Sequence, residues 1–294
     1  MTVPGPATPF RNILFTTDFS PCSEAVFLYA AALARECGAN LYSVHVIQAE
    51  ALNVDPPIID QLRESAVQQM HDLETSEMLQ DVPFHPVITE GVVGPTVAEV
   101  ARQNGIDVII VGTHGRTGMR KFVMGSVAED IVRHAPCPVI ALGPQVCTEA
   151  RHTPAFKRLL YATDFTPDSS ARFSRALTVL EPCIEHITLM HVISSPPITD
   201  ADTAKTVFRN TLLGMIPADS KLPTAPEAIV DAGTPADIIV ETAKDRKIDI
   251  IVLGVHPPGV MGTHLMHTGY RVMIDAPCPV LLVAAATAAA AAEA

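Results

Sequence analysis

One stretch of this acidic chain is rich in glycine and cationic side chains. The segment GTHGRTGMRKFVMGS, residues 112–126, holds two arginines and a lysine and has no Asp or Glu, although the 294 residues carry a formal net charge of −12. Its glycines let the backbone turn sharply and approach a ligand without a Cβ in the way. Gly125 and Ser126 then open a predicted helix, whose N–H groups and positive dipole end favour phosphate. These residues predict a site for a nucleotide polyphosphate.

Short apolar runs alternate with stretches of helical period along the first half of the chain. Ser20 is a good N-cap and Pro21 a good first helical residue for the helix after the first run, and Thr166 with Pro167 repeats this arrangement later. Near-continuous apolar strands joined by helices predict a parallel sheet covered on both faces, and hence a doubly wound α/β domain. The runs lie near 12–16, 40–46, 84–89, 107–111 and 138–142.

The chain contains this pattern twice. ILFTTDFSP recurs as LLYATDFTP, VHVI as MHVI, IDVIIVG as IDIIVLG and APCPVIAL as APCPVLLV, all in the same order. Repetition at a fixed period indicates a duplicated unit. We expect a first domain at 1–147, a second at 156–285 and an Ala-rich tail at 286–294.

In a doubly wound sheet, ligands bind outside the carboxyl ends of the strands, where the winding reverses. The 112–126 segment leaves the fourth strand and Asp18 leaves the first, so the two face one crevice if these strands are neighbours. Simpler structural roles are also open. Ser126 and Glu129 form a capping box, and Asp18 could only stabilise its turn. Glu129 and Asp130 would weaken the attraction for an anion.

The histidines divide into two groups. His45 and His191 lie in apolar strands, where we expect core histidines and not ligands. His114 lies between glycines of the 112–126 segment, where loop shaping and ligand contact are equally open. The histidines after residue 255 lack the Cys or carboxylate spacing of a metal site, so we predict no metal held by the protein alone.

The spacing Gly112, two residues, Gly115, nine residues, Gly125 and Ser126 resembles the ATP-binding signature of the universal stress protein family. TTDFS after the first strand and HAPCPV before the last are also typical of that family. The resemblance covers nearly the whole chain as a tandem pair. It implies a five-stranded parallel sheet of order 3-2-1-4-5 and a bound adenine nucleotide, ATP, ADP or AMP, with Mg²⁺ on its phosphates.

The resemblance also implies binding residues in the first domain. The nucleoside end, with the adenine, is expected to contact residues at the strand ends, namely Thr16, Asp18, Val46 and Val111. The ribose and phosphates are expected to contact the loop and the start of the next helix, at Gly112, Gly115, Gly125, Ser126 and Val127. We add His114 and Arg116 from the same loop as further candidates.

The second copy departs from this signature. It keeps the first glycine, but Pro257 stands where Gly115 stood, Met266 aligns near Gly125, and no Lys or Arg occurs from Gly254 to His267. Proline lacks a backbone donor, and methionine adds bulk where a phosphate should pass. We therefore expect nucleotide binding in the first domain alone, with the second as a structural partner.

Two main classes of function remain open. One is a nucleotide-dependent regulatory module for the stress response, and the other is a slow ATPase or nucleotidyl-transferring enzyme. Phosphoryl transfer needs a positioned base and metal-binding carboxylates, which the 112–126 segment lacks, so we favour binding over turnover. A nucleotide-free scaffold is the third alternative.

Composition bears on the setting and on partners. The acidic balance argues against a nucleic-acid surface, and six scattered cysteines without a C-x-x-C pair suit a reducing compartment. We see neither a secretory signal nor an apolar stretch of about 18 to 20 residues, and expect a cytoplasmic protein that binds no membrane. The apolar strands at 139–143 and 280–284 are potential edges that proteins tend to cover. The resemblance implies an intramolecular pseudo-dimer of the two domains, and a homodimer of two chains stays open.

Overall fold

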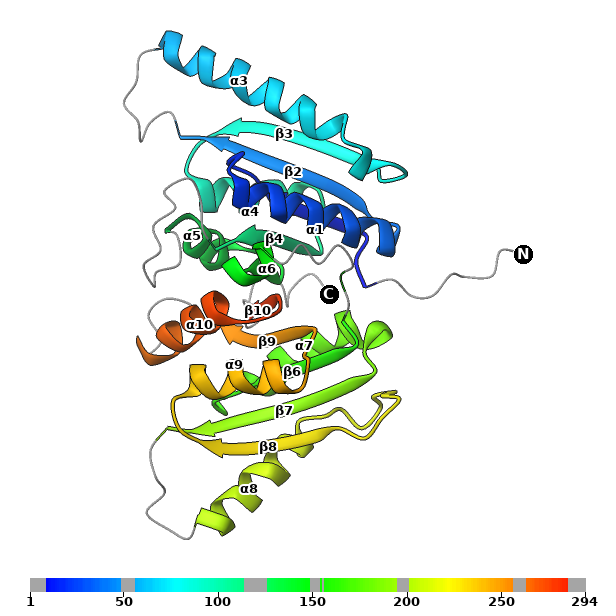
Figure 1. Cartoon of the computed structure of the whole chain (residues 1–294), viewed down its shortest axis with the longest axis vertical. Helices are drawn as coiled ribbons and strands as arrows, with labels where there is room; N and C mark the ends of the chain where they lie inside the picture. The colour runs from blue at the N-terminus through cyan, green and yellow to red at the C-terminus, as the bar shows by residue number, and fades with distance from the viewer. Residues whose placement is uncertain are drawn as a thin grey trace, which may run out of the picture. The chain divides into compact units, whose positions relative to one another are not determined.

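The computed structural model describes residues 9–48, 56–113, 126–148, 154, 156–194, 201–255 and 263–284. The chain divides into two compact units, one covering Phe10–Pro154 and the other containing Ala155–Ala294. Each unit is an α/β domain whose strands are flanked by helices (Figure 1). Several expected features lie outside the described residues, namely His114, Gly115, Arg116, Gly125, Pro257 and the tail at 286–294.

The described part of the first domain holds a parallel sheet of strand order β3-β2-β1-β4-β5, which confirms the predicted topology. Its strands are β1 (Asn12–Thr16), β2 (Asn40–Ile47), β3 (Phe84–Glu90), β4 (Val108–Gly112) and β5 (Val139–Leu142). Its helices are α1 (Pro21–Cys37), α3 (Pro56–Glu74), the 3-10 turn η1 (Glu77–Leu79), α4 (Val93–Gln103), α5 (Ser126–His134) and α6 (Pro144–Thr148).

The second domain repeats this order as β8-β7-β6-β9-β10. Its strands are β6 (Arg158–Ala162), β7 (His186–Ile193), β8 (Glu227–Ala232), β9 (Ile250–Val255) and β10 (Val280–Ala284). Its helices are α7 (Ser169–Leu180), the 3-10 turn η2 (Glu181–Cys183), α8 (Ala201–Gly214), α9 (Pro235–Asp245) and α10 (Thr263–Asp275).

The winding of the first domain reverses at β1. Ile13 of β1 pairs with Leu41 of β2 on one side and with Val108 of β4 on the other. Because crossovers between parallel strands are right-handed, the connections on the two sides of β1 place their helices on opposite faces of the sheet. The central strands are therefore covered twice, and the runs Ile13–Phe15 and Val108–Val111 are fully buried.

The two equivalent helices α1 and α7 begin differently. Ser20 caps α1 as predicted, since its side chain accepts a hydrogen bond from Ser23 N, and Pro21 is the first helical residue. The prediction that Thr166 and Pro167 repeat this arrangement is wrong, because α7 begins at Ser169. The Thr166 hydroxyl is engaged by the Ser169 hydroxyl at 3.0 Å and by Arg172 Nη1 at 3.2 Å, so it does not serve as the N-cap.

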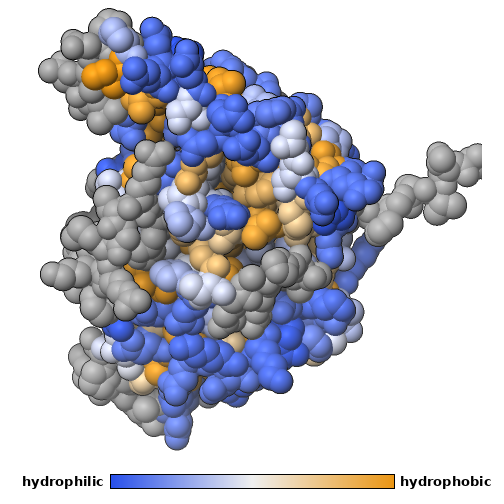
Figure 2. All heavy atoms as spheres, turned by 45° about the horizontal axis from the view of Figure 1, so that its top comes forward, coloured by the Kyte–Doolittle hydropathy of each residue, from blue (hydrophilic) through white to orange (hydrophobic). Residues whose placement is uncertain are grey.

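The surface is mostly polar on the face that Figure 2 shows, where hydrophilic side chains predominate among the described residues and apolar ones lie between them. Within the described ranges, no helix combines the length and the apolar character needed to cross a membrane.

Candidate functional site

A tight turn follows β1, and side chains set its geometry. Asp18 Oδ1 accepts a hydrogen bond from Ser20 N at 3.0 Å, and Thr17 Oγ1 accepts one from Phe19 N at 3.0 Å. Together they hold Phe19 at φ 59°, a left-handed conformation that residues with a Cβ rarely adopt. Asp18 thus has the turn-stabilising role considered from the sequence, and its contact with a ligand stays a prediction.

His45 ties this turn to β2. Its Nδ1 donates to the carbonyl oxygen of Thr17 at 2.9 Å, and its ring centroid lies 4.7 Å from that of Phe19. Since a carbonyl oxygen only accepts, Nδ1 carries a proton in this arrangement. Thr17 N also donates to the Val44 carbonyl at 3.0 Å. These contacts give His45 the structural role that its position in an apolar strand predicts.

Four of the expected residues meet at the carboxyl edge of β2, β1 and β4, which are neighbours in the sheet. Thr16 ends β1, Asp18 follows it, Val46 lies near the end of β2 and Gly112 ends β4. All four are half-buried. Val111 differs, because its side chain is 1% exposed and belongs to the core. The edge thus presents a mixed polar and apolar surface at the strand where the winding reverses.

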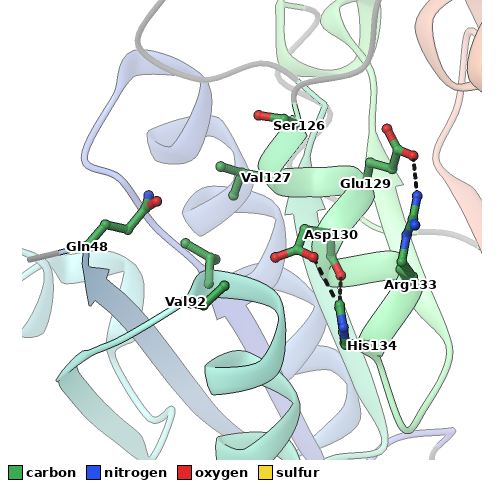
Figure 3. A pocket seen from close by; sticks show the side chains of 9 residues that line it. Gln48, Val92, Ser126, Val127, Glu129, Asp130, Arg133 and His134 are labelled. Atoms are coloured by element: carbon green, nitrogen blue, oxygen red, sulfur yellow. Dashed lines mark hydrogen bonds and ion pairs between the residues drawn. The ribbon is translucent and has the colours of Figure 1, made fainter. Parts of the chain in front are cut away.

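A cavity of about 600 Å³ lies beside the first turn of α5 (Figure 3). It is lined by Gln48 after β2, by Val92 and Val93 at the start of α4, and by six residues of α5, namely Ser126, Val127, Glu129, Asp130, Arg133 and His134. Its volume lies within the roughly 300–1,000 Å³ of small-molecule sites. α5 begins at Ser126, so this serine is the first residue of the helix and not the residue before it.

Sequence reasoning found the α5 side of this cavity and missed the other side. Gln48 and Val92 belong to segments about 80 and 35 residues before Ser126 in the chain, and carry no motif of their own. Each follows a strand, β2 or β3, at the same carboxyl edge of the sheet. Their place at the end of predicted strands was the one signal that could have found them.

Glu129 in the first turn of α5 and Asp130, the next residue, both have hydrogen-bond partners. Glu129 Oε1 accepts from Arg133 at 2.7 Å, and Asp130 Oδ2 accepts from Gly94 N at 2.8 Å. Figure 3 shows Glu129 beside Arg133, and both side chains line the same cavity as Val127. Because Asp130 serves the positive end of α4 and Glu129 is offset by Arg133, the repulsion of an anion is weaker than the sequence suggests.

The described residues were also compared with the requirements of a metal site. Among the described residues, no group of three or more His, Cys, Asp or Glu is placed to hold a metal ion.

Similarity to known proteins agrees with this architecture. The model of the universal stress protein family matches residues 9–142 and again 155–284. The chain is 27% identical over 139 residues to universal stress protein MJ0531 of Methanocaldococcus jannaschii, and 31% identical over 145 residues to universal stress protein A homolog 1 of Coxiella burnetii. Each match spans 45% of this chain, with 82% and 96% of the respective relative.

A solved structure matches both domains at once. The crystal structure of a universal stress protein from Archaeoglobus fulgidus covers 94% of this chain and 96% of its own, with a TM-score of 0.67 and 20% identity. At that identity the likeness concerns the fold. Because the family model matches twice and spans most of the sequence, the chain belongs to the universal stress protein family, with two tandem domains.

Proposed function

We propose that the first domain binds an adenine nucleotide, ATP, ADP or AMP, and that the chain acts as a nucleotide-dependent regulatory module in the stress response. The observation that carries this proposal is the meeting of Thr16, Asp18 and Gly112 at one edge of the sheet. The exposed start of α5 opens on a cavity at the carboxyl edge of the same sheet. Parallel sheets of this kind bind ligands at that edge.

The residues present fit such a ligand at both ends. The half-buried Val46 offers apolar surface for a base, next to a turn that hydrogen bonds hold in place. The first residues of α5, Ser126 and Val127, are exposed. They form the N-terminal end of the helix, where backbone N–H groups point outward. Glu129 and Asp130 line the same cavity, but each accepts a hydrogen bond, from Arg133 and from Gly94 N, which weakens their repulsion of a phosphate at the helix start. The phosphates would bring their own Mg²⁺.

The second domain is proposed to leave the equivalent position without nucleotide. Gly254 of β9 corresponds to Gly112, and a Cβ placed on it would lie 2.8 Å from Cδ of Arg172. The Arg172 side chain therefore packs directly on the end of β9, where it is 1% exposed and donates to Thr166 Oγ1 at 3.2 Å. A native side chain fills the corner that a nucleotide would need.

Equilibrium titration of the purified full chain with ATP, ADP and AMP tests both proposals. We expect saturable binding at about one nucleotide per chain. Two nucleotides per chain would overturn the proposal for the second domain alone. No saturable binding of any of the three would overturn the proposal for the first domain.

A charge placed on the cavity wall locates the site. Val127→Asp adds a carboxylate at the start of α5, which the helix dipole tolerates but a phosphate does not. We expect about tenfold weaker affinity or more, equal to at least about 1.4 kcal/mol. Val67→Asp is the matched control, because Val67 is a similarly exposed valine on α3. Equal affinities for the two variants would place the nucleotide elsewhere.

We further propose that the edge strands β5 and β10 are covered by pairing between the two domains of one chain. Each comes last in the strand order of its own domain and is apolar almost throughout. Open apolar edges are prone to further pairing, so both need a cover. Light scattering coupled to size exclusion should give one chain per particle, whereas a dimer would favour pairing between chains.

A further inference from the structure

Two cysteines that lie far apart in the sequence meet in the first domain. Cys22 in the first turn of α1 and Cys147 in α6 have their Sγ atoms 3.4 Å apart. The two cysteines are 125 positions apart in the sequence, so no short sequence motif predicts that they pair. Both cysteines are reduced, and both residues are partly exposed to solvent.

The surroundings of the two sulfurs are unequal. Cys22 is the second residue of the 17-residue helix α1, where backbone N–H groups stabilise negative charge. The hydrogen bond with Cys22, together with burial, raises the pKa of the Cys147 thiol. Either sulfur can donate in the contact between them, and Cys147 Sγ also lies 3.9 Å from the Leu142 carbonyl oxygen, to which it can donate. The helix start favours the thiolate at Cys22, which assigns Cys22 as the attacking sulfur and Cys147 as the resolving one.

We propose that Cys22 and Cys147 form a redox-active dithiol that a hydroperoxide oxidises to an intramolecular disulfide. The Cys22 thiolate attacks a peroxide oxygen, so that an S–O bond forms, the O–O bond breaks and the departing oxygen takes up a proton. Cys147 then attacks the Cys22 sulfenic acid, forming the S–S bond and releasing water as the S–O bond breaks. Two thiols lose two electrons and two protons, and hydrogen peroxide becomes two waters.

The geometry favours this pair over the other cysteines of the described chain. A disulfide needs the sulfurs at about 2.05 Å, so the two Sγ atoms need only a small approach from 3.4 Å. Cys37 and Cys278 are buried, whereas Cys137 and Cys183 are half-buried like the pair. The bond would fasten α6, which follows the last strand of the first domain, to the start of α1. The inference does not depend on nucleotide binding.

The test is intact-protein and peptide mass spectrometry of the reduced full chain after exposure to hydrogen peroxide and removal of the oxidant. We expect the mass to fall by two hydrogens, a cross-linked peptide pair containing Cys22 and Cys147, and reversal by a dithiol reductant. Cys22→Ser and Cys147→Ser should each abolish the cross-link. Cys137→Ser and Cys183→Ser are matched controls that should retain it.

A second measurement separates chemistry from misfolding. In Cys147→Ser the oxidised Cys22 has no resolving partner, so dimedone, a reagent for sulfenic acids, should label Cys22 in this variant. In the unaltered protein, labelling at Cys22 should be at least tenfold lower. The proposal is overturned if peroxide gives no Cys22–Cys147 link in the unaltered protein, or if a disulfide forms equally well in Cys22→Ser.

Discussion

The turn after the first strand has the same backbone conformation and the same hydrogen bonds in both domains. Phe19 has φ 59° and Phe165 has φ 58°. His45 and His191 each donate from Nδ1 to a threonine carbonyl at 2.9 Å. Asp164 Oδ1 accepts from a backbone N–H two residues on, as Asp18 Oδ1 does. The turn that carries the family-typical TDF residues is thus a scaffold that persists whether or not the neighbouring loop keeps the binding signature.

The two domains differ in the buried side chains next to that turn, on the first helix and the first strand. Val26 of α1 is fully buried, and its counterpart in α7 is the equally buried Arg172. Tyr161 replaces Phe15 in the adjacent strand, and its hydroxyl donates to the Ser169 carbonyl at 2.8 Å. The second domain thus carries polar side chains where the first carries an apolar core.

Aromatic cover adds to this difference. In the second domain Phe208 of α8 stacks on Phe165, with ring centroids 5.6 Å apart and planes 13° apart, and also contacts the His191 ring at 4.7 Å. Side chains of the second domain thus occupy the surroundings of its turn. The comparison teaches that the two domains differ in what packs around the turn and not in the turn itself, and the proposed difference in nucleotide binding rests on that packing.

The contact between α4 and α5 in the first domain also differs from the contact between α9 and α10 in the second. Asp130 of α5 accepts from Gly94 N at the start of α4, whereas the corresponding pair in the second domain is an ion pair between Arg271 and Asp237 at 2.5 Å. Gly94 corresponds to Ala236. Close backbone approach in one domain is therefore replaced by a surface charge pair in the other.

The largest expected effect comes from closing the gap at Gly94. A Cβ there would lie 2.5 Å from Asp130 Oδ2 and 2.7 Å from the Asp130 carbonyl oxygen. Alanine ordinarily stabilises a helix relative to glycine by about 1 kcal/mol. Gly94→Ala should instead destabilise by roughly 1–3 kcal/mol, because α4 and α5 must separate. Urea unfolding followed by circular dichroism measures the change.

The matched variant lies in the other domain. Ala236→Gly should cost about 1 kcal/mol, the ordinary propensity difference. If Gly94→Ala left stability unchanged or increased it, the close approach between α4 and α5 would be refuted.

The sequence predicted the strands of the first domain well, but not the contacts that depend on how distant segments pack. The strands near 12–16, 40–46, 84–89, 107–111 and 138–142 were predicted within a residue or so, because an apolar run between helical stretches leaves few alternatives. The start of α7 was not predicted correctly, because the Thr166 hydroxyl forms hydrogen bonds with the side chains of Ser169 and Arg172, and the sequence pattern does not reveal these contacts. The pairing of Cys22 with Cys147 is another contact set by topology and invisible to spacing.

An effect of intermediate size is expected at Tyr161, which makes the stability of the second domain depend on pH. Burial raises the pKa of Tyr161 to about 12, so the folded state favours the protonated phenol. Its contribution to stability is fully present below pH 10 and is lost as the pH rises from 10 toward 12. Tyr161→Phe, which installs the residue of the first domain, should cost about 1 kcal/mol near neutral pH by depriving the Ser169 carbonyl of its donor.

Urea unfolding of the two proteins across that pH window measures the effect. The stability difference between the unaltered protein and Tyr161→Phe should shrink as the pH rises from 10 to 12, since the variant has no phenol to ionise. Tyrosines common to both proteins cancel in the difference. A pH-independent difference would mean that Tyr161 ionises as readily in the folded chain as in the unfolded one.

The smallest effect is expected at the surface junction of the second domain. Arg271 and Asp237 are both about half exposed, so water and salt screen their attraction. Asp237→Asn should change the unfolding free energy by no more than about 0.5 kcal/mol, and the change should fade in high salt. Asp130→Asn should cost about 1 kcal/mol and resist salt better, because its carboxylate accepts from the partly buried N–H of Gly94 at a helix start. Unfolding of both variants at low and high salt ranks the two junctions, and equal costs would mean that the α4–α5 contact is no stronger than a surface ion pair.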